Sequence, residues 1–385
     1  MPAGSTPRVA IVHDWLDTWR GGENVLAEVL QLYPDATLYA LVDFLPDALR
    51  PRIGGRRART SFLQHVPGAR RHFRALLPMF PRAIASLDLS AFDTIVSISH
   101  AVAKGVRVHA GQRHACYCLT PMRYAWDLRD DYFPVGSGRA MLRPVADRVL
   151  DKLRDWDRGA NDGVTEFAAI SQFIAERIAR HYGRSSRVIY PPVDTDYFHP
   201  GGDVPSRDYY LAASRWVPYK RIDAIVAAFA QMPARRLIVA GDGPDTARIR
   251  TAARANVEFV GEVSRERLRE LLRNARAFVF AAEEDFGILP LEAQACGTPV
   301  IAYARGGALE TLADDGDSPV AAFFATQSPE AIADAVRALE ARAAPIDAAR
   351  CVANAQRYGA PRFRREFSEF VDGHGGGAPH VRTAP

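Results

Sequence analysis

Glu284 and Glu292 stand eight residues apart and bracket the run Asp-Phe-Gly-Ile-Leu-Pro-Leu. Gly287 permits a turn, and Pro290 suits the first turn of a helix because its missing N–H is not needed there. We therefore expect Glu284 to close a strand and Glu292 to lie just inside the next helix, so that both carboxylates flank one cavity. Paired carboxylates can act as acid and base on a glycosidic bond, and a single carboxylate can hold ribose hydroxyls. The competing interpretation for Glu292 is an ion pair with a neighbouring arginine.

Two cations, Arg215 and Lys220, lie five residues apart in an expected strand-to-helix loop. Arginine offers a fork of donors and lysine a point charge, so the two side chains can bind one diphosphate together. Where a nucleoside diphosphate is the leaving group, such cations stabilise the charge that develops on its phosphates. The alternative is that both are ordinary surface charges on a loop.

Glycines follow two other expected strands. Gly21 and Gly22 open a helix, and paired glycines at a helix N-terminus let backbone N–H groups approach a phosphate. Gly241 and Gly243 end another strand and allow the backbone to come close to a nucleotide. The Gly21-Gly22 segment lacks the full Gly-x-Gly-x-x-Gly pattern of a dinucleotide site, so a plain loop-to-helix cap is the alternative there.

Short apolar runs alternate with helical patterns along the chain. Such near-continuous runs are typical of parallel strands buried on both faces, and the alternation predicts doubly wound α/β domains. Ligands bind at the carboxyl ends of the strands in such sheets, where the residues above are expected. The expected strands are 9–12, 94–98, 115–118, 209–212, 237–240, 257–260, 278–280 and 299–302, and the expected helices include 221–231, 245–255 and 265–273.

A proline- and glycine-rich connector separates two series of strands. Residues 190–194 and 199–202 contain three prolines and two glycines, which interrupt helix formation. We expect one Rossmann-like domain at 1–186, a second at 187–358, a helix at 359–372 that crosses back to the first domain, and a disordered tail at 373–385.

The composition excludes several classes of protein. Of the 385 residues 48% are hydrophobic, enough for two cores, yet no run reaches the ~20 apolar residues of a membrane span. No signal-peptide pattern follows the N-terminus, so we expect a cytoplasmic protein. The four cysteines show neither a disulfide framework nor zinc-ligand spacing, and we expect Cys116 and Cys118 in the core.

The net charge of +4 is unevenly placed along the chain. Residues 48–87 contain no Asp or Glu, and nine arginines alternate there with apolar side chains. This mixture suits an anionic membrane surface or a phosphorylated acceptor. A plain solvated basic face is the alternative, and nucleic acid is not expected as a partner because no binding motif accompanies the stretch. The arginines are Arg50, Arg52, Arg56, Arg57, Arg59, Arg70, Arg71, Arg74 and Arg82.

Taken together, these motifs resemble glycosyltransferase family 4. The resemblance covers residues 8–370 and is carried by Ser214–Lys220, Gly241–Gly243 and Glu284–Val300. It implies a GT-B fold, in which two Rossmann-like doubly wound domains face a cleft, with the acceptor on the N-terminal side and the nucleotide-sugar donor on the C-terminal side. Segments 59–64, 99–105 and 120–127 are similar to those of bacterial mannosyltransferases that build O-antigen and related polysaccharides from GDP-mannose.

The resemblance implies roles for individual residues. Arg215 and Lys220 match a clamp on the donor diphosphate, Glu284 matches the glutamate beside the donor sugar, and Glu292 matches the residue that holds the ribose. His100 matches a histidine that faces the donor sugar and joins Arg215, Lys220 and Glu284 as catalytic residues. The other implied donor contacts are Gly21, Gly22, Gly241, Gly243, Phe286, Gly287, Ile288 and Leu289, and the implied acceptor contacts are Arg123 and Tyr124.

The activity that the resemblance implies is retaining, metal-independent transfer of a hexose onto a lipid-linked or growing saccharide, in cell-surface polysaccharide synthesis. The expected donor is GDP-mannose, and no cofactor beyond this substrate is expected. The expected location is the cytoplasm, with peripheral binding to the inner membrane through residues 48–87. Leu119 stands where relatives commonly have histidine, so the identity of the acceptor is inferred less directly from those relatives. A non-catalytic nucleotide-sugar-binding protein and a GT-B-fold nucleotide-sugar epimerase remain as alternatives.

Overall fold

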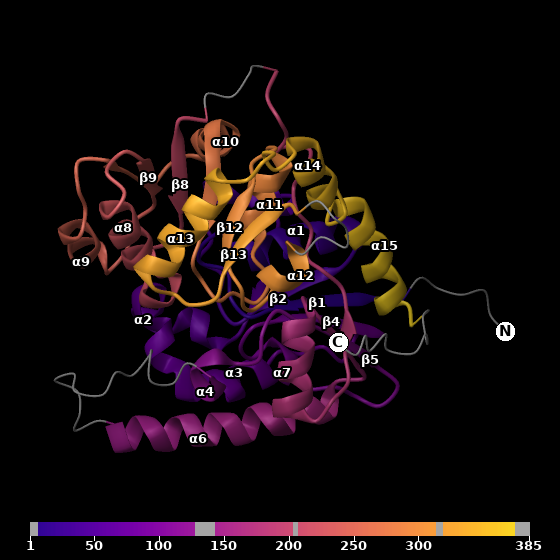
Figure 1. Ribbon diagram of the computed structural model, residues 1–385. Coiled ribbons are helices and arrows are strands. Elements are labelled where there is room, and N and C mark those ends of the chain that lie inside the picture. The colour runs from indigo at the N-terminus through magenta and orange to yellow at the C-terminus, as the bar shows by residue number, and fades with distance from the viewer. Residues whose placement is uncertain (1–6, 128–142, 203–206, 313–318, 374–385) are drawn as a thin grey trace. The chain divides into compact units, whose positions relative to one another are not determined.

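The computed structural model describes residues 7–127, 143–202, 207–312 and 319–373 (Figure 1). The chain divides into two compact units: an N-terminal unit of residues 1–190 and 363–385, and a C-terminal unit of residues 191–362. The chain thus returns to its first unit after completing the second, and helix α15 (Ala360–Val371) carries this return. The tail expected at 373–385 lies outside the described residues, apart from Gly373.

Seven parallel strands form the sheet of the N-terminal unit, in the order β3-β2-β1-β4-β5-β6-β7. The central strand β4 is buried along its whole length, as expected for a strand covered on both faces. The strands are β1 (Val9–His13), β2 (Thr37–Ala40), β3 (Arg59–Thr60), β4 (Thr94–Ser99), β5 (Arg113–Cys118), β6 (Glu166–Ala169) and β7 (Arg187–Val188).

Helices and 3-10 turns connect these strands. Helix α7 shows the local signals clearly, because the Ser171 hydroxyl accepts a hydrogen bond from the Ile174 N–H at its start and Gly183 ends it in the left-handed conformation. The helices are α1 (Gly21–Leu32), α2 (Ala69–His72), α3 (Phe80–Ala85), α4 (Arg123–Trp126), α6 (Arg143–Gly159) and α7 (Gln172–Tyr182), and the 3-10 turns are η1 (Asp47–Ile53), η2 (Phe62–His65), η3 (Phe73–Met79), η4 (Ala103–Gly105) and η6 (Ala160–Gly163).

Helix α15 is held on the N-terminal unit by aromatic packing and by one arginine. Phe363 and Phe367 meet Tyr117 of β5 edge-to-face, at ring-centroid distances of 5.9 and 5.5 Å. Arg113 donates hydrogen bonds to the carbonyls of Phe370 and Val371, which are among the last carbonyls of this helix. The C-terminal segment is therefore an integral part of the first unit.

Six parallel strands form the sheet of the C-terminal unit, in the order β10-β9-β8-β11-β12-β13. Helices α8 and α13 pack together, as do α11 and α14 (Figure 1). The strands are β8 (Tyr209–Ala213), β9 (Arg236–Ala240), β10 (Val257–Gly261), β11 (Ala275–Phe280), β12 (Val300–Tyr303) and β13 (Ala321–Phe324). The helices are α8 (Ile222–Ala230), α9 (Thr246–Thr251), α10 (Arg265–Asn274), α11 (Ile288–Ala295), α12 (Ala308–Thr311), α13 (Pro329–Glu340) and α14 (Ala348–Gln356), and η7 (Pro218–Lys220) precedes α8.

Each sheet has one point where the winding direction of the chain reverses. In the N-terminal unit this point lies between β1 and β4, and in the C-terminal unit between β8 and β11. Loops on the two sides of such a point diverge, which leaves a crevice at the carboxyl ends of the strands where ligands bind. Residues that directly follow these four strands are therefore the first candidates for function.

The predicted α/β class is confirmed, and the predicted strands are all present with ends that shift by one to three residues. Strands β2, β3, β6, β7 and β13, which are only two to four residues long, were not predicted from the sequence. Helix α9 is shorter than predicted because the chain turns after it. There the Asn256 amide donates to the carbonyls of Phe229, Met232 and Arg235.

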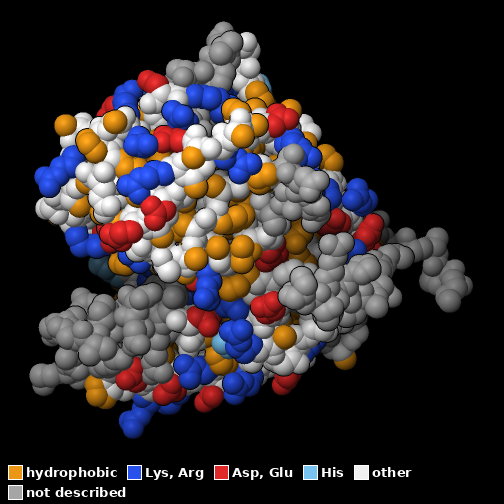
Figure 2. Space-filling model, in the orientation of Figure 1, with side chains coloured by type: hydrophobic (Ala, Val, Ile, Leu, Met, Phe, Trp, Pro, Cys, Tyr) orange, Lys and Arg blue, Asp and Glu red, His pale blue; other side chains and the backbone are white. Residues whose placement is uncertain are grey.

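No helix in the described ranges has the length and apolar character needed to cross a bilayer. All four cysteines are buried free thiols, so the prediction that Cys116 and Cys118 lie in the core is confirmed. On the face drawn in Figure 2, Lys and Arg side chains are interspersed with Asp and Glu side chains.

Candidate functional site

The reversal point of the N-terminal unit brings together Asp14, directly after β1, and His100, directly after β4. Asp14 is fully buried, and its carboxylate accepts hydrogen bonds from the backbone N–H groups of four successive residues. The donors are His100 and Ala101 at 2.6 and 3.0 Å to Oδ2, and Val102 and Ala103 at 2.5 and 2.7 Å to Oδ1. One carboxylate therefore fixes the whole loop that carries His100.

The imidazole of His100 lies against the same carboxylate, with Nδ1 at 2.8 Å from Asp14 Oδ2. Burial by itself would lower the pKa of His100, but the charge and hydrogen bond of Asp14 together with the charge of Glu23 outweigh burial and raise the pKa above its usual value. Burial would likewise raise the pKa of Asp14, but the charge and hydrogen bonds of His100 lower it overall. The His100 side chain is 30% exposed, so its other nitrogen can reach a ligand.

Helix α1 begins at Gly21 and Gly22, close to this pair. Its N-terminus is closed in part by Glu23, whose carboxylate accepts a hydrogen bond of 2.7 Å from the Arg20 N–H. Glu23 also lies 3.6 Å from His13, a fully buried residue whose two ring nitrogens have no hydrogen-bond partner among the described residues. The N–H groups of Gly21 and Gly22 belong to the first turn, where helices leave donors for an anion.

The predicted acceptor residues Arg123 and Tyr124 are half-buried on the short helix α4. A polar network fixes the end of this helix, since Trp126 Nε1 donates to Asp157 Oδ2 at 2.8 Å. Asp157 also forms a buried ion pair with Lys104, at 2.8 Å, from the loop that contains His100. The network thus joins the predicted acceptor segment to the predicted donor-facing loop within one unit.

At the reversal point of the C-terminal unit, Arg215 follows β8 and Glu284 follows the end of β11. Lys220, in η7, forms an ion pair with Glu284. Arg215 is exposed and forms no ion pair with any residue that the structure describes. Two cations and one carboxylate therefore occupy the crevice where a ligand is expected.

The segment 284–287 is braced by the loop before α12. The Gly307 N–H donates to the Glu284 carbonyl at 2.8 Å, and buried Phe286 meets Tyr358 edge-to-face at 5.8 Å between ring centroids. Gly287, with φ of 88°, turns the chain into α11, which has no side-chain cap at its N-terminus. The N–H groups of Ile288 and Leu289 therefore lie in the first turn of α11, where an anion can accept their hydrogen bonds.

Gly241 and Gly243 have a role that was not predicted from the sequence. A Cβ atom on Gly243 would lie 2.2 Å from the Trp216 carbonyl oxygen, and one on Gly241 would lie 1.9 Å from the Ser214 carbonyl oxygen. The backbone that approaches these glycines is thus that of the β8–α8 loop, which carries Arg215. Their predicted contact with the donor stays a prediction.

Glu292 lies on α11 and is partly exposed, and no hydrogen bond joins its carboxylate to a described residue. The pKa of Glu292 is raised to about 7. Burial is the largest cause of this increase; the positive charge of Arg265 opposes it, and the negative charge of Asp194 adds to it. Arg265 instead pairs with Asp194 at 2.6 Å and lies over the Tyr197 ring. Among the described residues, Glu292 therefore forms no ion pair with an arginine, contrary to the competing interpretation.

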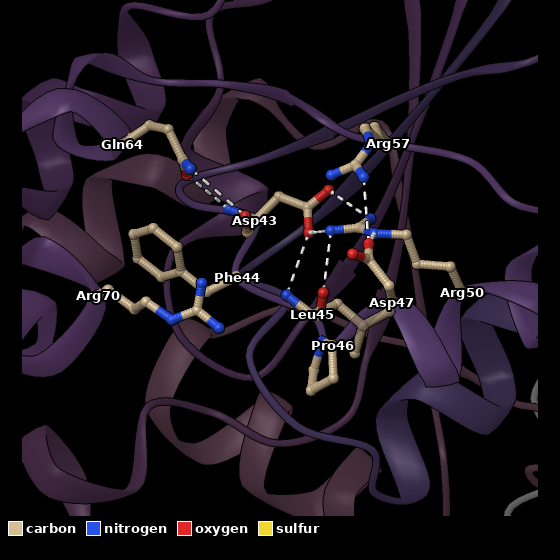
Figure 3. A pocket seen from close by; sticks show the side chains of 9 residues that line it. All are labelled: Asp43, Phe44, Leu45, Pro46, Asp47, Arg50, Arg57, Gln64 and Arg70. Atoms are coloured by element: carbon tan, nitrogen blue, oxygen red, sulfur yellow. Dashed lines mark hydrogen bonds and ion pairs between the residues drawn. The ribbon is translucent and has the colours of Figure 1, made fainter.

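A cavity of about 320 Å³ lies beside the carboxyl end of β2 in the N-terminal unit (Figure 3). Buried Arg50 uses all its donors on one side of it, on Asp43, Asp47 and the carbonyls of Leu45 and Arg56. Arg50 therefore does not belong to the basic face predicted for residues 48–87. Exposed Arg57, which pairs with Asp47 at 3.1 Å, and exposed Arg70 also line the cavity.

Comparison with known proteins gives a family match in the second unit. Residues 196–358 match the family described as glycosyl transferases group 1. The matched range contains Arg215, Lys220, Glu284 and Glu292, so it includes the motifs that carried the resemblance.

Relatives and solved structures extend this finding. The chain is 34% identical over 152 residues to D-inositol 3-phosphate glycosyltransferase of Mycobacterium avium, with 34% of this chain and 36% of that protein covered. It is 32% identical over 206 residues to a GDP-mannose-dependent alpha-(1-6)-phosphatidylinositol monomannoside mannosyltransferase of Mycobacterium tuberculosis, with 46% and 51% covered. The chain thus spans about a third to half the length of these curated relatives.

The fold of both units recurs in solved structures. Anabaena Alr3699/HepE in complex with UDP and glucose has a TM-score of 0.67 at 17% identity, with 95% of this chain and 100% of that chain covered. Sucrose-phosphate synthase from Thermosynechococcus elongatus has a TM-score of 0.69 at 19% identity, with 95% and 98% covered. The predicted GT-B fold class is confirmed, whereas the cleft between its domains stays a prediction.

Two residues that support the site were not assigned a role from the sequence. Asp14 holds the His100 loop in the N-terminal unit, and Gly307 holds the Glu284 loop in the C-terminal unit. Asp14 carried one usable signal, since a carboxylate directly after a buried strand needs partners. Gly307 carried no comparable signal, because its contact depends on how two loops pack.

Proposed function

We propose that the chain is a retaining, metal-independent glycosyltransferase that moves mannose from GDP-mannose onto a lipid-linked or growing saccharide. The observation that carries the proposal is the grouping at the β8–β11 reversal point of Arg215, Lys220, Glu284 and the uncapped start of α11. These groups supply positive charge and N–H donors to a diphosphate. The family of residues 196–358 supports the same reaction class.

The Lys220–Glu284 ion pair can be exchanged for contacts with the donor. An arriving diphosphate competes with Glu284 for the ammonium of Lys220, and this exchange leaves the Glu284 carboxylate available to accept hydrogen bonds from sugar hydroxyls. Glu292, whose carboxylate accepts no hydrogen bond from a described residue, accepts the ribose hydroxyls. One ion pair would thus be replaced by two contacts with the donor.

We propose a front-face displacement for the chemical step. The bond between the anomeric carbon and the β-phosphate oxygen breaks, the acceptor oxygen bonds to the same face of that carbon, and the departing phosphate oxygen takes the acceptor proton. Arg215, Lys220 and the first turn of α11 stabilise the charge that develops on the phosphate. Such preorganised donors each contribute on the order of 3 kcal/mol to the lowering of the barrier.

The choice of mannose and GDP rests on resemblance. Segments 59–64, 99–105 and 120–127 are similar to those of polysaccharide mannosyltransferases, and one relative is named as GDP-mannose-dependent. Arg123 and Tyr124 of α4 would contact the acceptor. Peripheral binding to an anionic membrane would bring the enzyme to a lipid-linked acceptor, and the cytoplasm is its proposed location.

The test is incubation of the protein with radiolabelled GDP-mannose and a membrane extract. Label that moves to lipid or glycan, in the presence of EDTA as in its absence, supports the proposal. An epimerised nucleotide sugar would point to an epimerase instead, and binding without turnover would point to a nucleotide-sugar-binding protein. Parallel incubations with UDP- and ADP-sugars test the choice of donor.

A further inference from the structure

Asp14 is a carboxylate with no access to water in the described structure. A buried carboxylate is costly unless hydrogen bonds or an opposite charge compensate it. Four backbone N–H groups and the Nδ1 atom of His100 provide this compensation. Because both carboxylate oxygens act only as acceptors here, the proton between Asp14 and His100 belongs on Nδ1.

This arrangement fixes the orientation of the other ring nitrogen. With Nδ1 held by Asp14, Nε2 is on the opposite side of the ring, and the side chain is 30% exposed. The Trp15 ring packs edge-on against His100 at 4.6 Å, which restricts rotation of the imidazole. The structure records no hydrogen bond from Nε2 to a described residue, so it can meet a ligand.

We propose that Asp14 is a positioning residue that keeps His100 protonated on Nδ1 and points Nε2–H at an oxygen of the transferred sugar. This inference rests on the proposed function for the identity of the ligand, but not for the Asp14–His100 geometry. A charged imidazole donates a stronger hydrogen bond than a neutral one, and it complements charge on a reacting donor. The charge of His100 is thus set by a residue that does not touch the substrate.

The charged groups around His100 agree with this role. Asp14 and Glu23 both favour the protonated ring, whereas burial and Arg20 oppose it, and the pKa of His100 is raised on balance. His13 is a further titratable neighbour, at 6.2 Å between ring centroids. A raised histidine pKa means that the protonated form persists to higher pH, and that its hydrogen bond is lost as pH rises through that value.

The experiment is an NMR titration of ring resonances of His100, assigned with His100→Gln, in the wild type and in Asp14→Asn. The expected results are a proton on Nδ1 and a pKa above 6.5 in the wild type, and a pKa lowered by about 1 or more in Asp14→Asn. Asp93→Asn, which removes an exposed carboxylate that pairs with Arg8 before the start of β4, is the control and should leave the His100 titration unchanged.

Activity gives a second readout with radiolabelled donor. The alkaline limb of the kcat profile should move to lower pH by the same amount in Asp14→Asn and stay in place in Asp93→Asn. A wild-type His100 with an unprotonated Nδ1, or with a pKa at or below 6.5, overturns the proposal even if Asp14→Asn does not fold. Because the titration uses no substrate, it separates this inference from failure of the proposed transferase activity.

Discussion

Glu292 shows how a carboxylate can be prepared for a ligand that brings hydroxyl groups. Its pKa is raised to about 7 because burial disfavours the charge and no described residue donates a hydrogen bond to it. The cost of holding this charge is recovered when ribose hydroxyls donate to both oxygens. The ionised form is the one that accepts two such bonds, so donor binding should require pH above the pKa.

We predict that kcat/KM for the donor falls as pH decreases through about 7 in the wild type, and that Glu292→Gln loses this dependence. At pH 8 the variant should bind donor about 10- to 100-fold more weakly, as expected for loss of hydrogen bonds to a charged group. Steady-state kinetics from about pH 5.5 to 8.5 measure both effects. An unchanged pH profile in Glu292→Gln would contradict the role given to Glu292.

Glu292→Gln is expected to increase the stability of the fold, although it weakens donor binding. A carboxylate whose pKa is raised on folding makes the folded state less favourable once pH exceeds its unfolded value. The neutral amide that Glu292→Gln introduces avoids this cost, so thermal unfolding at pH 8 should occur a few degrees higher in the variant. At pH 5 the two proteins should unfold at similar temperatures.

At the scale of elements, the β8–α8 loop owes its shape to two glycines on the neighbouring loop. The Trp216 N–H donates to the Asp242 carbonyl at 2.9 Å, and the missing Cβ of Gly243 makes this approach possible. The loop that carries Arg215 is therefore placed by the loop that follows β9. Packing of this kind couples the donor clamp to the stability of the C-terminal unit.

We predict that Gly243→Ala destabilises the protein by about 2–4 kcal/mol, because the added methyl group would clash with the Trp216 backbone rather than with a movable side chain. Gly202→Ala is the control, since a Cβ there would have no neighbour within 4 Å. Urea unfolding of both variants measures the difference. Equal stability of the two variants would show that the loops do not need this close approach.

Much of the fold was predictable because parallel strands buried on both faces leave long apolar runs, as in β4 and β8. Short edge strands such as β3 and β7 were missed, since two residues carry no periodicity. At the site, the positions of Arg215, Lys220 and Glu284 after strands and of Glu292 inside the following helix were predictable from the sequence. The support from Asp14 and Gly307 was not, because it depends on which loops meet at each reversal point.

At the scale of the whole molecule, the arginine-rich stretch contributes a basic surface, defined here as Phe62, Arg70, Arg71, Met79 and Arg82. All five side chains are exposed, and Phe62 and Met79 are among four exposed large hydrophobic residues in the described chain. Leu63, Phe73 and Phe80 from the same stretch are buried in the core instead. The five residues of the basic surface therefore expose three cations and two large apolar side chains.

We predict that the protein co-sediments with anionic liposomes at low salt and that replacing Arg70, Arg71 and Arg82 by Ser weakens this binding. Each arginine near an anionic surface contributes about 1 kcal/mol, so the triple variant should bind on the order of 100-fold more weakly. Replacing exposed Arg254, Arg276 and Arg342 of the C-terminal unit by Ser removes the same charge and is the control. Equal binding by both triple variants would exclude the basic surface as the membrane contact.

We propose that this chain transfers sugar from a nucleotide-sugar donor and that Arg215 binds the donor diphosphate. The most direct measurement is the rate of label transfer from radiolabelled GDP-mannose by the wild type, Arg215→Ala and Arg254→Ala. Arg215 is exposed, so its loss should leave thermal unfolding unchanged but lower kcat about 100-fold. Arg254→Ala should behave as the wild type. Transfer by Arg215→Ala at the wild-type rate would contradict the account.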